Sequence, residues 1–183
     1  MFWEGEVRLS EAIKRLDAFD QRGRFVYAVR DLAKVLHGDS ARTHAATLSR
    51  LVKSGILQHP VKGVYVYTLS QHRGEHTLEL IARTLRRMEY NYVSLESALS
   101  EWGGISQIPV GRLTVMTTGR KGEYRTPYGV IEFTHTQRRA TEILASIVHR
   151  GRPLPIATKQ AAIRDLRRVG RNTHLMSESS STD

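Results

Sequence analysis

The chain has 183 residues, with 28 Lys and Arg against 18 Asp and Glu, which gives a net charge of +10. Its 40% hydrophobic and 25% charged residues are typical of a globular protein, so a fibrous or fully disordered chain is excluded. The absence of cysteine excludes disulfides, thiolate zinc sites and a cysteine nucleophile. No apolar run approaches the ~20 residues of a membrane helix. The first residues do not resemble a secretory signal, so we expect a cytoplasmic protein without a membrane partner.

The positive charge is concentrated toward the two ends of the sequence. Residues 1–74 carry 12 basic and 7 acidic side chains, and residues 134–176 carry 9 and 2, whereas residues 75–133 carry 7 of each. A basic surface of this size favours polyanions, above all nucleic acid.

We expect two domains followed by a tail. A polar stretch that ends in Gly74 separates a strand-like run from a helix-like one. The expected ranges are a DNA-binding domain over 1–72, an α+β domain over 73–176 and a disordered, serine-rich tail over 177–183.

The first domain is predicted to have the element order of a winged helix-turn-helix. Its expected elements are a helix from Glu11, a strand over 24–29, helices over 32–36 and 41–54, and strands over 56–59 and 64–69. Asp31 is the expected N-cap of the second helix, and Asp39 or Ser40 that of the third. Gly38 and Gly55 are the expected helix stops. The short turn over 38–40 and the hairpin that follows are typical of this motif.

The helix over 41–54 is the expected recognition helix. At about 100° a residue, the predicted core face holds Ala41, Ala45, Leu48 and Val52, with Leu51 to one side. The predicted exposed face holds Thr43, Thr47, Arg50 and Ser54, flanked by His44 and Ala46. No acidic residue lies between Ser40 and Glu75, so this face would not repel phosphate. A solvated amphipathic helix is the alternative.

Small, polar and positive side chains on such a helix suit the DNA major groove, and a lysine at the hairpin tip suits a phosphate. The expected DNA contacts are Arg42, Thr43, His44, Thr47, Arg50, Lys53 and Lys62. We expect an Arg50→Ala change to weaken or abolish sequence-specific binding.

The second domain is predicted to be a small α+β domain with antiparallel strands. Its expected elements are helices over 77–85, 95–102 and 158–169 and strands over 90–93, 113–118 and 129–134. The polar segment over 119–127 is the expected connection between the last two strands.

A second basic surface is expected in this domain, from Arg138, Arg139, Arg164, Arg168 and Arg171. It would bind nucleic acid, RNA included, or an acidic partner. The alternative is a solvated helix face.

Catalysis and metal binding have no support in the sequence. The eight histidines show no metal-ligand spacing with a third ligand nearby. Gly119-Arg120-Lys121-Gly122 lacks the spacing of a phosphate-binding loop. No nucleophile motif is present. We therefore expect no enzyme activity, no metal and no cofactor.

Three groups of residues resemble the AbiEi-like antitoxins of type IV toxin–antitoxin and abortive-infection systems. The first runs from Asp31-Leu32-Ala33 through Leu48–Leu57 to Gly63-Val64-Tyr65 and is similar to that family's winged helix. The second runs over 92–109. The third contains Leu113–Arg120, Gly129–Phe133 and Ile156–Leu166.

The resemblance implies a transcriptional repressor that binds inverted repeats in its own promoter. It also implies an antitoxin that counteracts a nucleotidyltransferase-like toxin, without requiring a stable complex. An inverted repeat needs two recognition helices, from a dimer or from two adjacent monomers. The competing hypothesis is a non-catalytic interaction module whose basic surfaces bind RNA or an acidic protein.

Overall fold

A computed structural model of the chain describes residues 7–105 and 110–170. The chain divides into two compact units, Met1–Thr77 and Leu78–Asp183, whereas we expected the boundary between residues 72 and 73. Each unit mixes helices with strands, so the α+β class is confirmed. The predicted tail over 177–183 lies outside the described residues.

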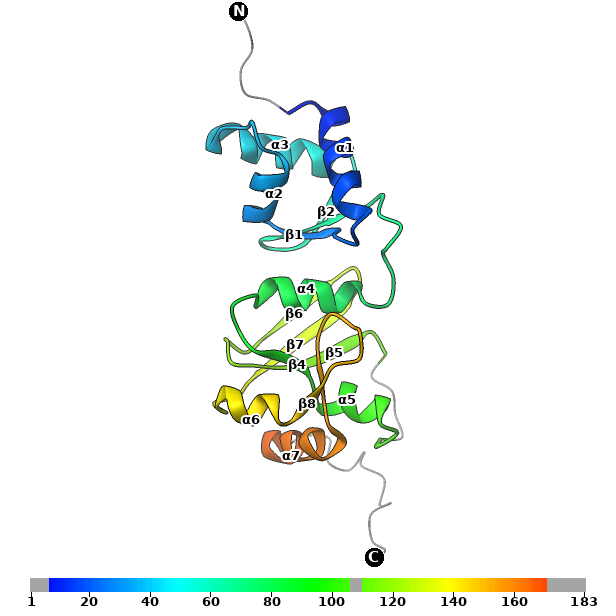
Figure 1. Cartoon of the computed structure of the whole chain (residues 1–183), viewed down its shortest axis with the longest axis vertical. Helices are drawn as coiled ribbons and strands as arrows, with labels where there is room; N and C mark the ends of the chain where they lie inside the picture. The colour runs from blue at the N-terminus through cyan, green and yellow to red at the C-terminus, as the bar shows by residue number, and fades with distance from the viewer. Residues whose placement is uncertain (1–6, 106–109, 171–183) are drawn as a thin grey trace, which may run out of the picture. The chain divides into compact units, whose positions relative to one another are not determined.

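The N-terminal unit carries a small sheet and three helices (Figure 1). The helices are α1 (Leu9–Asp20), α2 (Val29–Val35) and α3 (Ala41–Lys53), and the strands are β1 (Val26–Ala28), β2 (Leu57–Val61) and β3 (Val64–Tyr67). The sheet is antiparallel in the order β1-β3-β2. Strand β3 of the β2–β3 hairpin therefore pairs with β1, the strand that precedes α2.

Local sequence explains most of these boundaries. The Ser40 hydroxyl accepts a hydrogen bond from the Thr43 amide at 3.2 Å, so the predicted cap of α3 is confirmed. Gly55 ends α3 with φ of +74°, a conformation that glycine adopts without strain. The predicted Asp31 cap is wrong, because α2 begins at Val29 and the Asp31 carboxylate reaches back to the Ala28 amide at 3.0 Å.

The core of the N-terminal unit combines leucines with two tyrosines. Leu16, Leu32, Leu51, Tyr27 and Tyr67 are fully buried. The Tyr67 hydroxyl donates a hydrogen bond to the Asp17 carboxylate of α1 at 2.5 Å, and the Tyr27 hydroxyl donates one to the Arg24 carbonyl at 2.5 Å. Burial raises the pKa of both phenols, so they remain neutral donors that tie the sheet to its surroundings.

The C-terminal unit is built on a larger mixed sheet. Its helices are α4 (Thr77–Leu85), α5 (Leu95–Glu101), α6 (Ala140–Leu144) and α7 (Lys159–Val169). Its strands are β4 (Asn91–Val93), β5 (Arg112–Thr117), β6 (Gly122–Thr126), β7 (Gly129–His135), β8 (Ile147–Val148) and β9 (Ile156–Ala157). The strand order is β6-β7-β5-β4-β9-β8.

The expectation of purely antiparallel strands is wrong in part. β5 runs parallel to β7, and β4 runs parallel to β9. The segment expected to be a simple connection forms β6, which pairs antiparallel with β7 at the sheet edge. The prediction missed this strand because most of its residues are polar. Glu123 and Arg125 are exposed, whereas Tyr124 between them packs edge-on against Phe133, with the ring centres 5.8 Å apart.

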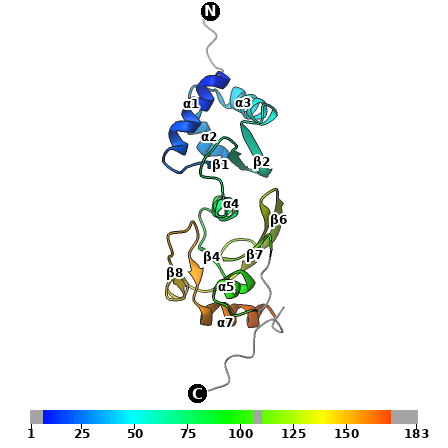
Figure 2. The same cartoon turned by 90° about the vertical axis from the view of Figure 1, so that its right-hand side faces the viewer.

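Helices cover both faces of this sheet, with α4 on one face and α5 and α7 on the other (Figures 1 and 2). On the α5 face, the Thr114 hydroxyl donates to the Ser94 carbonyl at 2.6 Å. On the α4 face, the Arg86 guanidinium lies 4.7 Å from the centre of the Phe133 ring. The helices over residues 7–105 and 110–170 all lack the length and hydropathy of a membrane span.

Candidate nucleic-acid interface

Helix α3 exposes a narrow face of short and basic side chains. The exposed residues of this face are Arg42, Ala45, Ala46, Ser49 and Lys53. The buried residues are His44, Thr47, Leu48 and Leu51. The predicted exposed face is therefore wrong, and the observed one is turned from it by roughly 110° about the helix axis at 100° a residue. The side chain of Ala41, predicted to be in the core, lies outside the described residues.

Four of the seven predicted DNA contacts do not belong to the exposed face. Thr47 is fully buried and His44 is 9% exposed. The Thr43 hydroxyl is used within the helix cap, where it lies 3.1 Å from the Ser40 carbonyl. The Arg50 guanidinium donates to the Val7 carbonyl at 2.6 Å, so Arg50 holds the segment before α1 against α3.

The remaining three predicted contacts, Arg42, Lys53 and Lys62, are exposed. Arg42 and Lys53 lie toward opposite ends of α3, and Lys62 lies at the tip of the hairpin. Within the described part of the chain, no hydrogen bond or ion pair joins any of the three side chains to another residue. Their charges are therefore available to an external anion.

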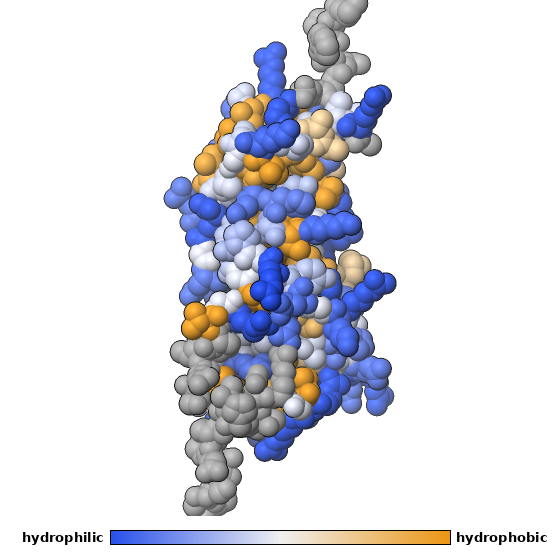
Figure 3. All heavy atoms as spheres, turned by 180° about the vertical axis from the view of Figure 1, so that it is seen from behind, coloured by the Kyte–Doolittle hydropathy of each residue, from blue (hydrophilic) through white to orange (hydrophobic). Residues whose placement is uncertain are grey.

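An open groove of about 610 Å³ runs beside α3 and the hairpin. Its apolar lining comes from Val29, Ala45, Leu48 and Val52. Its polar lining comes from His44, Ser49, Lys53, His59 and Tyr65. Figure 3, which views the side of the molecule that carries α3, shows apolar side chains at the surface of this unit between protruding hydrophilic ones.

The hairpin wall of the groove is held by a ring stack. The His59 and Tyr65 rings lie 4.4 Å apart with an interplanar angle of 10°. The Gly63 amide donates to Nε2 of His59 at 3.3 Å, so a neutral His59 ring carries its proton on Nδ1. The stack and this hydrogen bond together fix the His59 ring on the hairpin wall of the groove.

The carboxylates of this unit have partners other than Arg42, Lys53 and Lys62: Asp31 pairs with Arg24 and Glu11 with Arg15. Asp20 accepts hydrogen bonds from the Ser70 hydroxyl, from the Gln71 amide at 3.3 Å and from Nδ1 of His72 at 3.2 Å. Burial alone would raise the pKa of Asp20, but these hydrogen bonds outweigh it and the pKa lies below its ordinary value. Asp20 is therefore bound by groups other than Arg42 and Lys53.

Sequence reasoning missed the residues at the centre of the exposed face. Ala45 was assigned to the core as an apolar residue, and Ser49 was not singled out. Leu48 and Leu51 are three positions apart and therefore lie on the same side of the helix. The direction midway between their side chains coincides with the buried face in the structure. That pair was the better signal, because alanine is small enough to be placed on either face.

In the C-terminal unit, the predicted basic surface is divided between internal and exposed arginines. Arg138 forms an ion pair with Asp165, which is fully buried and also accepts a hydrogen bond from the Ser94 hydroxyl at 2.8 Å. The prediction for Arg138 is therefore wrong, since its charge neutralises Asp165. Burial raises the pKa of the neighbouring Tyr92 to about 12.

Arg139, Arg164 and Arg168 are exposed as predicted, and Arg171 lies outside the described residues. Arg168 donates to the His135 carbonyl at 3.1 Å and Arg164 to the Ser146 hydroxyl at 3.2 Å. Both bonds lie at the surface and involve neutral acceptors, so the positive charge of α7 remains uncompensated there.

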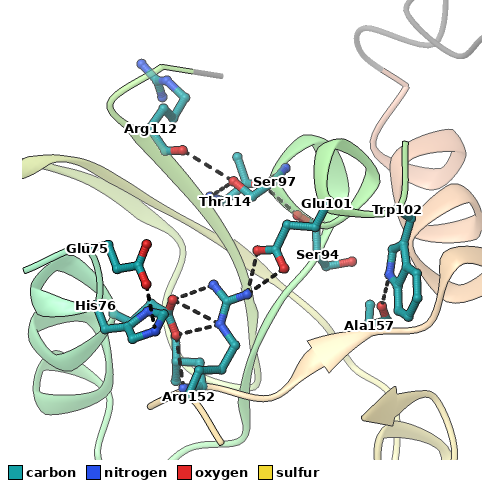
Figure 4. A network of polar contacts seen from close by, with 12 residues as sticks. Glu75, His76, Ser94, Ser97, Glu101, Trp102, Arg112, Thr114, Arg152 and Ala157 are labelled. Carbon is teal, nitrogen blue, oxygen red and sulfur yellow. Dashed lines mark hydrogen bonds and ion pairs between the residues drawn. The ribbon is translucent and has the colours of Figure 1, made fainter. Parts of the chain in front are cut away.

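Arg152, which was counted in the basic C-terminal region, is also internal (Figure 4). Its Nε lies 3.0 Å from a carboxylate oxygen of Glu79, and its Nη1 lies 2.5 Å from one of Glu101. Burial alone would lower the pKa of Arg152, but these carboxylates outweigh it and raise the pKa. Nearby, the Trp102 indole donates to the Ala157 carbonyl at 2.8 Å.

The comparisons with known proteins establish only the fold. No protein-family model matches the chain, and no curated protein matches it significantly. The crystal structure of the Rv2827c protein from Mycobacterium tuberculosis is similar, with a TM-score of 0.58 and 17% sequence identity. The match covers 87% of this chain and 61% of that one, so the chain spans about three fifths of that protein's length.

Proposed function

We propose that this chain is a sequence-specific DNA-binding repressor whose N-terminal unit is a winged helix-turn-helix. In this proposal α3 is the recognition helix and the β2–β3 hairpin is the wing. The observation that carries it is the exposed face of α3, where only alanines and a serine lie between Arg42 and Lys53 beside an open groove.

The chemistry of that face suits the DNA major groove. Alanine and serine allow the helix backbone to come close to the base edges. The Arg42 guanidinium can donate two hydrogen bonds to guanine. Lys53 and Lys62 can bind phosphates on either side and fix the position of the helix.

The exposed residues of helix α2 also support the proposal that α3 enters the major groove. It exposes Arg30 and Lys34, and it precedes α3 across a short turn. In helix-turn-helix proteins the first helix of the pair crosses the DNA backbone, where basic side chains contact phosphates. We therefore propose Arg42, Ala45, Ala46, Ser49, Lys53 and Lys62 as the contact set, with Arg30 and Lys34 on the backbone.

The family resemblance gives the biological setting of the proposal. Residues such as Ser94-Leu95-Glu96-Ser97-Ala98-Leu99 and Thr117-Thr118-Gly119-Arg120 are similar to AbiEi-like antitoxins. We propose that the chain is a cytoplasmic, non-catalytic antitoxin of a type IV pair. It would autoregulate its operon through inverted repeats and counteract a nucleotidyltransferase-like toxin.

A titration of the full-length chain tests DNA recognition. The probe is the duplex immediately upstream of its own gene, compared with a scrambled duplex of equal length across a salt series. We expect a preference of at least about 10³-fold for the upstream duplex, as for other specific readers. Equal, steeply salt-dependent binding to both duplexes would contradict the proposal.

The exposed basic face of α7 favours a second candidate, an interaction module for RNA or an acidic protein. Arg164, Arg167 and Arg168 are exposed there, and the acid of the same helix, Asp165, is buried. Charge reversal at Arg164 and Arg168 would abolish partner binding in that case. Under the repressor proposal, the same variant keeps its preference for the upstream duplex.

A further inference from the structure

The side chains at the centre of the exposed face of α3 are short, so they end close to the helix backbone. Ala45, Ala46 and Ser49 are exposed there, and none has more than one heavy atom beyond Cβ. Short side chains of this kind cannot reach across a groove. They can contact only groups that project from the base edges toward the helix.

The surface next to this centre is apolar. Val29 is 41% exposed, which is high for a valine, and it lines the same groove as Ala45 and Val52. Exposed apolar area of this kind gains free energy when a partner covers it. The partner must therefore offer apolar groups of small size.

The surrounding charge identifies the class of that partner. Lys53 lines the groove, Arg42 is exposed near the other end of α3 and Lys62 is exposed at the hairpin tip, and no acidic residue occurs between Ser40 and Glu75. A surface with an apolar centre and a positive rim matches a polyanion with apolar groups between its phosphates. In the major groove of DNA, the C5-methyl group of thymine is the apolar group that projects from the base edges.

We propose that Val29, Ala45 and Val52 read thymine methyl groups, so that the target carries thymine where the centre of α3 meets the bases. This inference rests on the proposed function, since it assumes that α3 enters the major groove. It adds a base preference that is independent of hydrogen bonding. It also makes Ala45 and Val29 specificity-determining residues.

Replacement of thymine by uracil tests the inference, because it removes only the methyl group and keeps base pairing. A random duplex library made with thymine is first selected on the full-length chain. The best duplex is then synthesised with uracil in place of thymine. With about 0.8 kcal/mol for each buried methyl, we expect affinity to fall about fourfold for one contact and roughly tenfold or more for two.

Variants locate the effect on the protein. Val29→Thr keeps the shape of the side chain but replaces a methyl by a hydroxyl, and Ala45→Gly removes the only side-chain carbon. We expect each variant to reduce the ratio of thymine to uracil affinity by about fourfold, one methyl contact. Ala18→Gly, at an exposed position of α1, is the control for the helix destabilisation that glycine causes and should keep the full ratio.

The outcomes separate the two proposals. A thymine preference that Val29→Thr and Ala45→Gly both diminish supports the inference. Sequence-selective binding with equal affinity for the thymine and uracil duplexes overturns the inference and leaves the proposed function intact. Failure of the selection to enrich any sequence overturns both. Val29→Thr keeps the test decisive if Ala45→Gly does not fold.

Discussion

The two units satisfy their carboxylates in different ways. In the N-terminal unit, Asp20 accepts from a hydroxyl, an amide and an imidazole, and Asp39 accepts from the Val7 amide at 2.9 Å. Two ion pairs of this unit, Arg24–Asp31 and Arg15–Glu11, each include a side chain that is about half exposed. In the C-terminal unit, Asp165 is paired with Arg138, and Glu79 is paired with Arg152.

This difference decides what the positive charge of each unit can do. Where the carboxylates have partners other than the cations of α3, Arg42 and Lys53 remain exposed and available to a polyanion. Where arginines neutralise buried carboxylates, the same residue type stabilises the fold. Net charge in a sequence segment therefore overstates the basic surface wherever acids from distant segments, such as Glu79 for Arg152, fold back onto it.

Two adjacent arginines give the strongest test of this comparison. Arg138→Met removes the cation from a buried pair and should lower the free energy of unfolding by about 3–5 kcal/mol. Arg139→Met removes the same charge from an exposed position and should change it by less than about 0.5 kcal/mol. Urea unfolding followed by circular dichroism measures both. Equal effects of the two changes would show that Arg138 does not stabilise the fold.

Arg42, in contrast to Arg138, should contribute to DNA binding and not to stability. Arg42→Ala should leave the urea midpoint unchanged but cost about 1–3 kcal/mol of binding to the upstream duplex, with less discrimination against scrambled DNA. Fluorescence anisotropy with a labelled duplex measures the loss. Lys14→Ala, which removes an exposed charge from α1, is the matched control. A loss of equal size in the control would remove Arg42 from the interface.

Lys62 should contribute charge without reading sequence. Lys62→Ala should weaken binding to all duplexes and reduce the slope of log affinity against log salt by roughly one, because one phosphate contact is lost. The salt series already described measures this slope. An unchanged slope, or a change confined to the upstream duplex, would contradict a phosphate contact at the hairpin tip.

The smallest expected effect concerns acid stability. The pKa of Asp20 is lowered in the folded chain, so its stabilisation is present at pH values above its ordinary pKa of 3.8 and is lost as the pH falls through the folded value. Ser70→Ala removes one donor and should raise that pKa, which moves acid unfolding of this unit to higher pH. Carboxyl NMR titration measures the pKa. Ser10→Ala, at an exposed position of α1, should leave it unchanged.

The sequence predicted the elements that depend on local chemistry. The cap at Ser40 and the stop at Gly55 form as expected, because each needs only neighbouring residues. The six-element order of the N-terminal unit follows from these signals together with the alternation of Val64-Tyr65-Val66-Tyr67.

The candidate site was harder to predict because it depends on packing. Thr47 and His44 are polar, yet they lie on the buried face because Leu48 and Leu51 set that face. Arg50 was the expected base contact, but the segment at Val7 folds back and accepts its hydrogen bond. In the C-terminal unit, strand β6 is polar because it lies at an edge, and its pairing with β7 is visible only in the fold.

The central claim is that α3 and the hairpin form the DNA interface, whereas Arg138 and Arg152 of the C-terminal unit stabilise the fold by pairing with buried carboxylates. The most direct measurement is an NMR titration of the ¹⁵N-labelled full-length chain with the upstream duplex. We predict that amide shifts concentrate in residues 41–53 and 57–67. Shifts concentrated in α7, with none in α3, would contradict the account and favour the α7 face as the binding surface.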